Sequence, residues 1–231
     1  PGHPGQARAV RWSRLNFSTL KPQGQETTRG QLDAKMLPFR SGSLAAAASV
    51  VNRGGVIAFP TDTVYGLGCD PFNERAVRRL FEIKDRASKP IPVLCRDLAA
   101  ARRLVELNER AGRLAGKYWP GALTIVAPLK RNVPEYLDQG TGWLGVRVPS
   151  GGDCLELIKS VGGYITGTSA NISGRPSCRS AGEVRRFLGK RVDLILDGGT
   201  LDALESTVVR VGGHGVEVLR RGSIALEPGK E

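Results

Sequence analysis

Histidine and paired cysteine, on which many active sites depend, are scarce in this sequence. There are two histidines, His3 and His214, which argues strongly against a histidine-based triad or a histidine-rich metal centre. The four cysteines, at positions 69, 95, 154 and 178, are far apart and form no C-x-x-C pair, so neither a zinc site nor a redox dithiol is predicted. We expect reduced thiols in an intracellular, cytoplasmic protein.

Long apolar runs and the common nucleotide-binding loops are also missing. No apolar run approaches the roughly 20 residues needed to cross a bilayer, so no membrane partner is expected. No G-x-x-x-x-G-K-[ST] stretch occurs, which argues against a Walker-type ATPase. One G-x-G-x-x-G match, at Gly140, Gly142 and Gly145, runs into a predicted strand instead of opening a helix, and we interpret it as a chance match.

Positive charge is what the sequence has in excess. Its 34 lysines and arginines against 22 aspartates and glutamates give a net charge of +12, which favours anionic partners such as nucleotides, nucleic acid or membrane headgroups. Aromatic residues make up only 6% of the chain and form no ladder for stacking bases, which argues against a sequence-reading RNA module. Charge alone leaves a nucleotide enzyme and an RNA-binding module both open.

The hydrophobic pattern predicts one folded domain after an irregular start. Residues 1–35 lack sustained periodicity and are rich in Gly, Pro, Gln, Arg and Thr, so we expect an N-terminal extension that is disordered or not native. Residues 41–227 are expected to form a single domain. Helical and strand patterns alternate early in this range and strands cluster late, which predicts an α/β fold with a twisted mixed sheet flanked by helices.

Local signals position the first elements of that domain. Ser41 or Ser43 is expected to cap the first helix, and Asn73 and Asp97 to cap two later ones. The segment 61–72 is expected to be a turn-rich loop. Short apolar runs typical of buried strands occur at 56–60, 91–95, 122–129 and 143–149.

Polar, small-residue segments recur where the predicted elements end. They are PTDTVYGLG (60–68), KDRASK (84–89), TSANISGRPSCR (168–179) and ESTVV…LRRG (205–222). Arg147, inside GVRVP, adds a charge on a predicted strand, where it needs a partner or a ligand. Together these segments predict ligand binding at the carboxyl ends of strands in an open α/β sheet. Cations without a histidine or a thiol pair suit phosphate chemistry by positioning and charge neutralisation.

Taken together, these motifs resemble one known family. PTDTVYGLG, KDRASKP, KYWPGALTIV, GVRVP, TSANISGRPS and ESTVV…LRRG follow the order and spacing of the YrdC-type threonylcarbamoyl-AMP synthases over about residues 41–226. The resemblance implies an α/β fold with a deep basic cleft. It also implies synthesis of threonylcarbamoyl-AMP and pyrophosphate from L-threonine, bicarbonate and ATP. A partner transferase would then modify adenosine 37 of tRNA, and tRNA itself is a candidate further partner.

The same resemblance assigns roles to individual residues. Lys84 and Arg86 would be catalytic. The residues expected to contact ATP are Lys84, Arg86, Lys89, Asn171, Arg179 and Arg220. Those expected to contact threonine are Thr61, Thr63, Arg147, Ser169 and Ser206. The resemblance implies no metal site made by the protein, and Mg²⁺ would be bound mainly through the ATP phosphates.

Two departures from the family pattern and two alternatives remain. KDRASKP is one residue shorter between its arginine and second lysine than the commoner form, and Leu94 stands where many members carry a histidine. The first alternative is a non-enzymatic RNA-binding module acting on tRNA or ribosomal RNA. The second is the related carbamoyl-transfer domain of hydrogenase maturation, which normally lies among zinc-finger and acylphosphatase segments that this sequence lacks.

Overall fold

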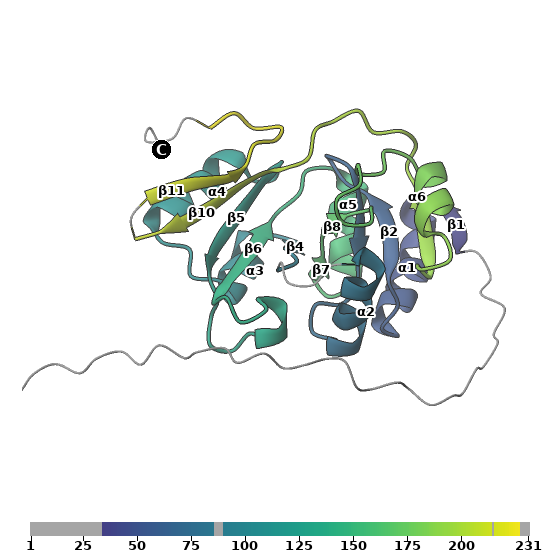
Figure 1. The fold of residues 1–231 in the computed structure, drawn as a ribbon, viewed down its shortest axis with the longest axis horizontal. Helices are drawn as coiled ribbons and strands as arrows, with labels where there is room; N and C mark the ends of the chain where they lie inside the picture. The colour runs from purple at the N-terminus through teal and green to yellow at the C-terminus, as the bar shows by residue number, and fades with distance from the viewer. Residues whose placement is uncertain (1–33, 86–89, 214, 227–231) are drawn as a thin grey trace, which may run out of the picture. The chain divides into compact units, whose positions relative to one another are not determined.

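Strands from distant parts of the chain build two neighbouring mixed sheets in the computed structural model (Figure 1). The structure describes residues 34–85, 90–213 and 215–226, and all statements below refer to these residues. They belong to one unit, Leu32–Glu231. The predicted α/β class is confirmed, but the strands are divided between two sheets instead of forming one.

Sheet A is assembled around the apolar strand β2. In spatial order it contains β1 (Lys35–Pro38), β9 (Leu194–Asp197), β2 (Ile57–Pro60), β3 (Tyr65–Gly68) and β8 (Thr168–Ser169). Strands β1 and β2 both run parallel to β9, whereas β3 runs antiparallel to β2 and β8. Every residue of β2 and β3 is buried, which explains why their sequences do not alternate between apolar and polar side chains.

Sheet B carries most of the later strands. Its spatial order is β11 (Gly215–Arg220), β10 (Thr207–Gly212), β5 (Leu123–Pro128), β6 (Trp143–Arg147), β4 (Val93–Cys95) and β7 (Tyr164–Thr166). The pairs β10–β5 and β4–β6 are parallel, and β10–β11, β5–β6 and β4–β7 are antiparallel. The register sets Arg147 beside Leu94 and Ile125 opposite Val146.

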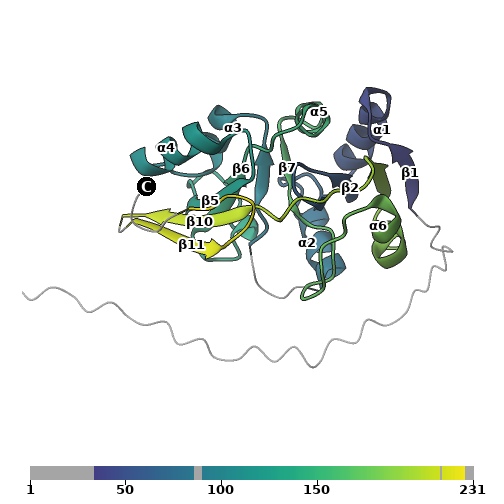
Figure 2. The same cartoon turned by 90° about the horizontal axis from the view of Figure 1, so that it is seen from above.

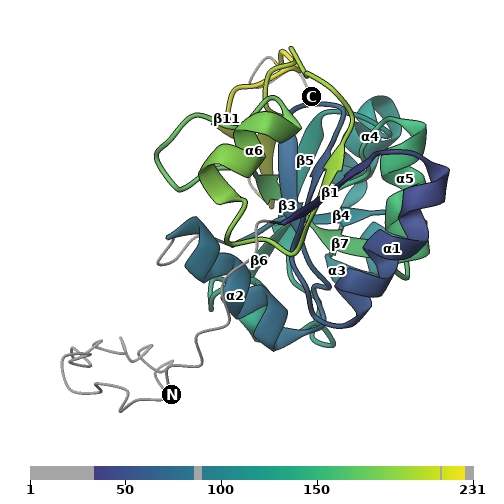
Figure 3. The same ribbon diagram turned by 90° about the vertical axis from the view of Figure 1, so that its right-hand side faces the viewer.

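Helices pack on both sheets, but within the described residues one face of sheet B is not covered by a helix. The helices are α1 (Ser41–Asn52), α2 (Glu74–Lys84), α3 (Leu98–Leu104), α4 (Glu109–Tyr118), α5 (Gly152–Ser160), α6 (Ala181–Leu188) and the short 3₁₀ helix η1 (Glu135–Leu137). Helix α1 packs on β2, β9 and α5, while α6 packs on β2 and β9 from the opposite side of sheet A (Figures 2 and 3). Helices α3 and α4 pack on the strands of sheet B.

Gly167 is the residue at which the chain passes from one sheet to the other. It separates Thr166, the last residue of β7, from Thr168, the first residue of β8. Its amide donates to the carbonyl of Pro92 over 2.8 Å. A methyl group at this position would lie 2.4 Å from Cγ of Leu94, far inside van der Waals contact. The connection between β7 and β8 can pass this close to the side chain of Leu94 in β4 because residue 167 has no side chain.

The local predictions held at most helix starts and failed at two strands. Asn73 and Asp97 cap α2 and α3 by accepting from the backbone three residues on, as expected. The first helix begins after Arg40, and neither Ser41 nor Ser43 is its N-cap. The segment 61–72 was wrongly predicted to be all loop, since it contains β3. Strand β1 was not predicted at all, and it lies before the expected start of the domain.

The close contact at Gly167 predicts a specific stability effect. Replacing Gly167 with Ala should lower the free energy of unfolding by about 1–3 kcal/mol, because the new methyl must displace the buried Leu94 side chain. Combining Gly167→Ala with Leu94→Ala should cost less than the sum of the two single changes. Urea denaturation measures all three. The control is Gly116→Ala in α4, where the methyl meets open space and should stabilise slightly. Strict additivity to within about 0.5 kcal/mol would refute the contact.

Candidate active site

A cavity of about 550 Å³ lies over one face of sheet B and against the edge of sheet A. Sheet B contributes alternate residues of single strands, because side chains on the same face of a strand are two residues apart. These residues are Trp143, Gly145 and Arg147 of β6, Thr124 and Val126 of β5, and Val208 and Arg210 of β10. From sheet A and its connections it takes Thr61, Thr63, Val64, Tyr65, Gly66, Thr168 and Ser169. The lining includes three arginines and one glutamate.

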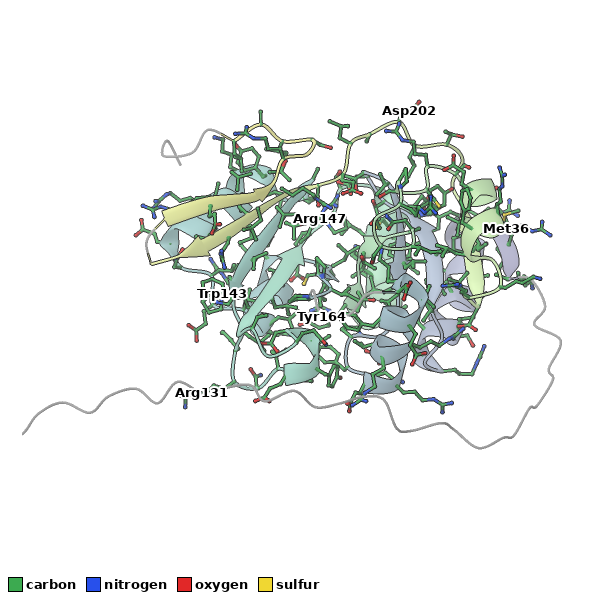
Figure 4. The ribbon with its side chains drawn as sticks, viewed as in Figure 1. Met36, Arg131, Trp143, Arg147, Tyr164 and Asp202 are labelled. Atoms are coloured by element: carbon green, nitrogen blue, oxygen red, sulfur yellow. The ribbon has the colours of Figure 1, made fainter. Side chains whose placement is uncertain are left out.

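Arg147 is the buried cation of this cavity. It is the last residue of β6 and lies between the two sheets, whereas Trp143 lies at the far end of the same strand (Figure 4). Its Nε donates to the carbonyl of Gly121 over 2.8 Å, and its Nη1 donates to Oγ1 of Thr63 over 3.3 Å. Its Nη2 donates to Oδ1 of Asp62. The Arg147 and Asp62 side chains are only 6% and 11% exposed.

The loop between β2 and β3 is held by its own threonines. Oγ1 of Thr61 lies 2.9 Å from Oγ1 of Thr63 and donates to the carbonyl of Val64 over 2.8 Å. The amide of Thr63 in turn donates to Oγ1 of Thr61 over 3.1 Å. These bonds fix the loop so that two hydroxyl groups face the cavity beside the guanidinium of Arg147.

A second arginine, Arg220 at the end of β11, stands on the other rim. Its Nη2 donates to the carbonyl and the hydroxyl oxygen of Ser206 over 2.9 and 3.0 Å, and its Nη1 donates to Oε2 of Glu205. Ser177 donates to the other oxygen of Glu205, and Ser206 also bonds with Thr124. The Arg220 side chain is 43% exposed, whereas that of Arg147 is 6% exposed.

Lys84, the last residue of α2, lies behind Ser169 and is 2% exposed. Its Nζ donates to the Ser169 carbonyl over 2.6 Å and to Oδ1 of Asn171 over 2.5 Å. Ser169 Oγ also donates to Oδ1 of Asn171 over 2.8 Å. Lys84 therefore supports the turn that contains Ser169. Because Ser169 lines the cavity, the positive charge of Lys84 lies directly behind the cavity wall.

The structure brings together most of the site predicted from the sequence. Thr61, Thr63, Arg147, Ser169, Ser206 and Arg220 all line the cavity, as does Leu94. Lys84 and Asn171 adjoin it through Ser169. Arg179 is not among the lining residues, and its exposed side chain instead lies 3.8 Å from Asp202. Arg86 and Lys89 lie outside the described residues, so their roles stay predictions.

Two carboxylates that were not predicted from the sequence bind Arg147 and Arg220. Asp62 lies inside the PTDT segment and Glu205 begins the ESTVV segment, so both were within quoted motifs. Nothing local indicated their partners, because Arg147 is 85 residues from Asp62 and Arg220 is 15 from Glu205. Trp143 and Arg210, which also line the cavity, were missed as well, and Cζ of Arg210 lies 5.9 Å from the centroid of the Trp143 ring.

Metal-ligating side chains do not gather into a cluster in the part of the chain that the structure describes. In residues 34–85, 90–213 and 215–226, no group of three or more His, Cys, Asp and Glu is arranged to hold a metal ion. The two carboxylates beside the cavity are already bonded to arginines.

Within the same ranges, none of the helices has the length and apolar character required to cross a membrane.

Comparison with known proteins decides the family. The model for Sua5, YciO and YrdC proteins, described as telomere recombination, matches residues 49–222. The chain belongs to the Sua5, YciO and YrdC family. This confirms the resemblance drawn from the motifs, and the matched range contains every described residue of the predicted site.

Two relatives of this chain are named threonylcarbamoyl-AMP synthase. A threonylcarbamoyl-AMP synthase of Pyrococcus abyssi is 39% identical over 184 residues, which are 78% of this chain and 54% of that protein. A threonylcarbamoyl-AMP synthase of Halorhodospira halophila is 36% identical over 79% of this chain and 95% of that protein. The crystal structure of P. abyssi Sua5 complexed with L-threonine superposes with a TM-score of 0.76 at 35% identity, covering 82% of this chain and 57% of the other. This chain thus spans about half of the P. abyssi relative and nearly all of the H. halophila one.

The four thiols of this family member are buried and unpaired. Burial raises the pKa of Cys69 and of Cys154 to about 12 and that of Cys178 to about 11, and it raises the pKa of Cys95 as well. The thiolate is the nucleophilic form, so at neutral pH these cysteines are poor candidates for covalent catalysis.

These raised pKa values predict slow thiol chemistry in the folded state. At pH 8, Ellman's reagent should modify the native protein at least about 100-fold more slowly than the urea-unfolded chain, since a pKa two units higher leaves about 100-fold less thiolate. Unfolding removes the burial and restores the ordinary pKa. A native cysteine that reacts at the unfolded rate would contradict this picture.

Proposed function

We propose that this chain synthesises threonylcarbamoyl-AMP and pyrophosphate from L-threonine, bicarbonate and ATP, as the first step of threonylcarbamoyladenosine formation at position 37 of tRNA. A partner enzyme then transfers the threonylcarbamoyl group to tRNA in the cytoplasm. The observation that carries the proposal is one cavity lined by Thr61, Thr63, Arg147, Ser206 and Arg220, in a chain that aligns with 95% of a relative named threonylcarbamoyl-AMP synthase.

Threonine suits the buried end of the cavity. Arg147 has five N–H groups, and its bonds to Gly121, Thr63 and Asp62 use three, which leaves one on each terminal nitrogen for a carboxylate. A carboxylate bound by two parallel N–H groups is the geometry that arginine recognises best. The hydroxyl groups of Thr61 and Thr63 lie beside it for the polar atoms of the amino acid.

The nucleotide suits the more exposed rim. In the proposed reaction the threonine amine adds to CO2 and loses a proton, or condenses with bicarbonate and releases water, to give a carbamate. A carbamate oxygen then attacks the α-phosphorus of ATP as pyrophosphate leaves. Negative charge grows on the phosphate oxygens, so Arg220 and the charge of Lys84 behind Ser169 lower the barrier by electrostatic stabilisation. Predicted phosphate contacts by Arg86, Lys89 and Arg179 belong to the same proposal.

Mg²⁺ fits this site only as an ion carried by the nucleotide. Glu205 and Asp62, the carboxylates beside the cavity, are engaged by Arg220 and Arg147. An ion bound through ATP phosphates and water, as Mg²⁺ commonly is, would neutralise phosphate charge without a protein cage.

The alternative, a non-enzymatic RNA-binding module, lacks a comparable argument. A concave pocket with a buried guanidinium is typical of small-molecule sites, whereas RNA recognition uses exposed stacking surfaces. A direct assay separates the two. Protein mixed with ATP, L-threonine and bicarbonate should release pyrophosphate, and omitting threonine or bicarbonate should abolish the release. Retention of tRNA without any pyrophosphate would favour the RNA-binding alternative instead.

Lys84 provides a sharper test of the charge argument. Lys84→Met keeps the aliphatic stem but removes the ammonium group, and pyrophosphate release should fall by about 100-fold or more, in the range for losing one preorganised charge. Arg78→Met is the matched control, because Arg78 lies on the same helix but pairs with Glu74 at the surface. A folded Lys84→Met protein with near-normal turnover would remove Lys84 from the mechanism.

A further inference from the structure

Asp62 lies directly behind the cavity and does not line it. It belongs to the loop between β2 and β3 of sheet A, whereas its partner Arg147 ends β6 of sheet B. The contact between them therefore crosses from one sheet to the other. Both side chains are almost completely buried, so neither charge is screened by bulk water.

Three donors fix the carboxylate of Asp62 in place. Oδ2 accepts from the amide of Ser150 over 3.1 Å and from its hydroxyl group over 2.9 Å. Oδ1 accepts from Nη2 of Arg147. A carboxylate bonded on both oxygens cannot rotate freely, so its orientation dictates where the guanidinium of Arg147 lies.

We infer that Asp62 is a positioning residue for the amino-acid substrate. It acts through Arg147: it holds the guanidinium so that one N–H of each terminal nitrogen remains for the substrate carboxylate, and it does not touch the substrate itself. This inference rests on the proposed function, because it takes the carboxylate of threonine as the ligand of Arg147.

Other contacts of Arg147 cannot supply this orientation alone. Gly121 and Thr63 are neutral acceptors, and the Thr63 contact is long at 3.3 Å. With a neutral group at position 62, the guanidinium would lose its charged partner and could turn toward any anion in the cavity. The expected defect is thus loss of precise carboxylate recognition, with ATP binding at the exposed rim left intact.

The test is Asp62→Asn, which keeps the size of the side chain and one oxygen acceptor. In the pyrophosphate assay, KM for L-threonine should rise on the order of 10- to 100-fold, while KM for ATP changes by less than about 3-fold. A matched control is Asp193→Asn, because Asp193 also binds an arginine, Arg79, and a backbone amide, that of Val56, but lies away from the cavity. Asp193→Asn should leave both KM values unchanged.

Two results would overturn the inference. A folded Asp62→Asn protein with an unchanged KM for threonine would mean that Asp62 does not position the site. Equal rises in both KM values, together with a lowered Tm, would mean that it only stabilises the fold. If Asp62→Asn fails to fold, Ser150→Ala serves instead, since it removes one bond to Asp62 and should raise KM for threonine in the same direction by a smaller factor.

A measurement without substrate separates this inference from the proposed function. The Nη2–H signals of Arg147, the group that donates to Asp62, are assigned by their loss in Arg147→Lys. They should exchange slowly with water in the wild-type protein and at least about 10-fold faster in Asp62→Asn. Wild-type protein that makes no pyrophosphate would refute the proposed function, and the exchange rate would still decide whether Asp62 holds Arg147. Equal exchange rates in the two proteins would refute the positioning role even in an active enzyme.

Discussion

The buried ion pair between Arg147 and Asp62 is the constraint on which the cavity depends. It joins strand β6 of sheet B to the loop that follows β2 of sheet A, and both side chains are almost fully removed from water. Removing one partner from such a pair leaves an uncompensated buried charge, which typically destabilises a protein by about 3–5 kcal/mol. The pair therefore fixes how the two sheets meet and where a guanidinium faces the cavity.

The arginines at the two ends of the cavity, Arg147 and Arg220, differ in how far they are buried. Arg220 is also held by a carboxylate, that of Glu205, but these side chains are 43% and 32% exposed. Exposed pairs contribute only about 0–1 kcal/mol, so breaking the contact between Arg220 and Glu205 costs little. A rigid end suits a small amino acid that must be held in one pose, and a looser end suits a flexible phosphate chain.

The site lies where it does because the two sheets meet there. The chain crosses between them in one step at Gly167, which has no side chain and so lets Leu94 approach closely. Helices α3 and α4 pack on sheet B, and the residues facing the cavity, such as Thr124 and Trp143, alternate along single strands. Leu94 lines this same wall, so the local surface is apolar there.

Local sequence determined the α/β class, most element positions, two helix caps and the segments that carry the site. Those signals come from neighbouring residues, as when Asn73 caps α2 with its own side chain. Tertiary structure alone decided the division into two sheets, the strand β1, and the partners of the arginines. Strand β1 exists because Met36 pairs with Ile195 across most of the chain, and Asp62 meets Arg147 across 85 residues. No local pattern encodes such contacts, because they depend on how distant segments pack once the core has formed.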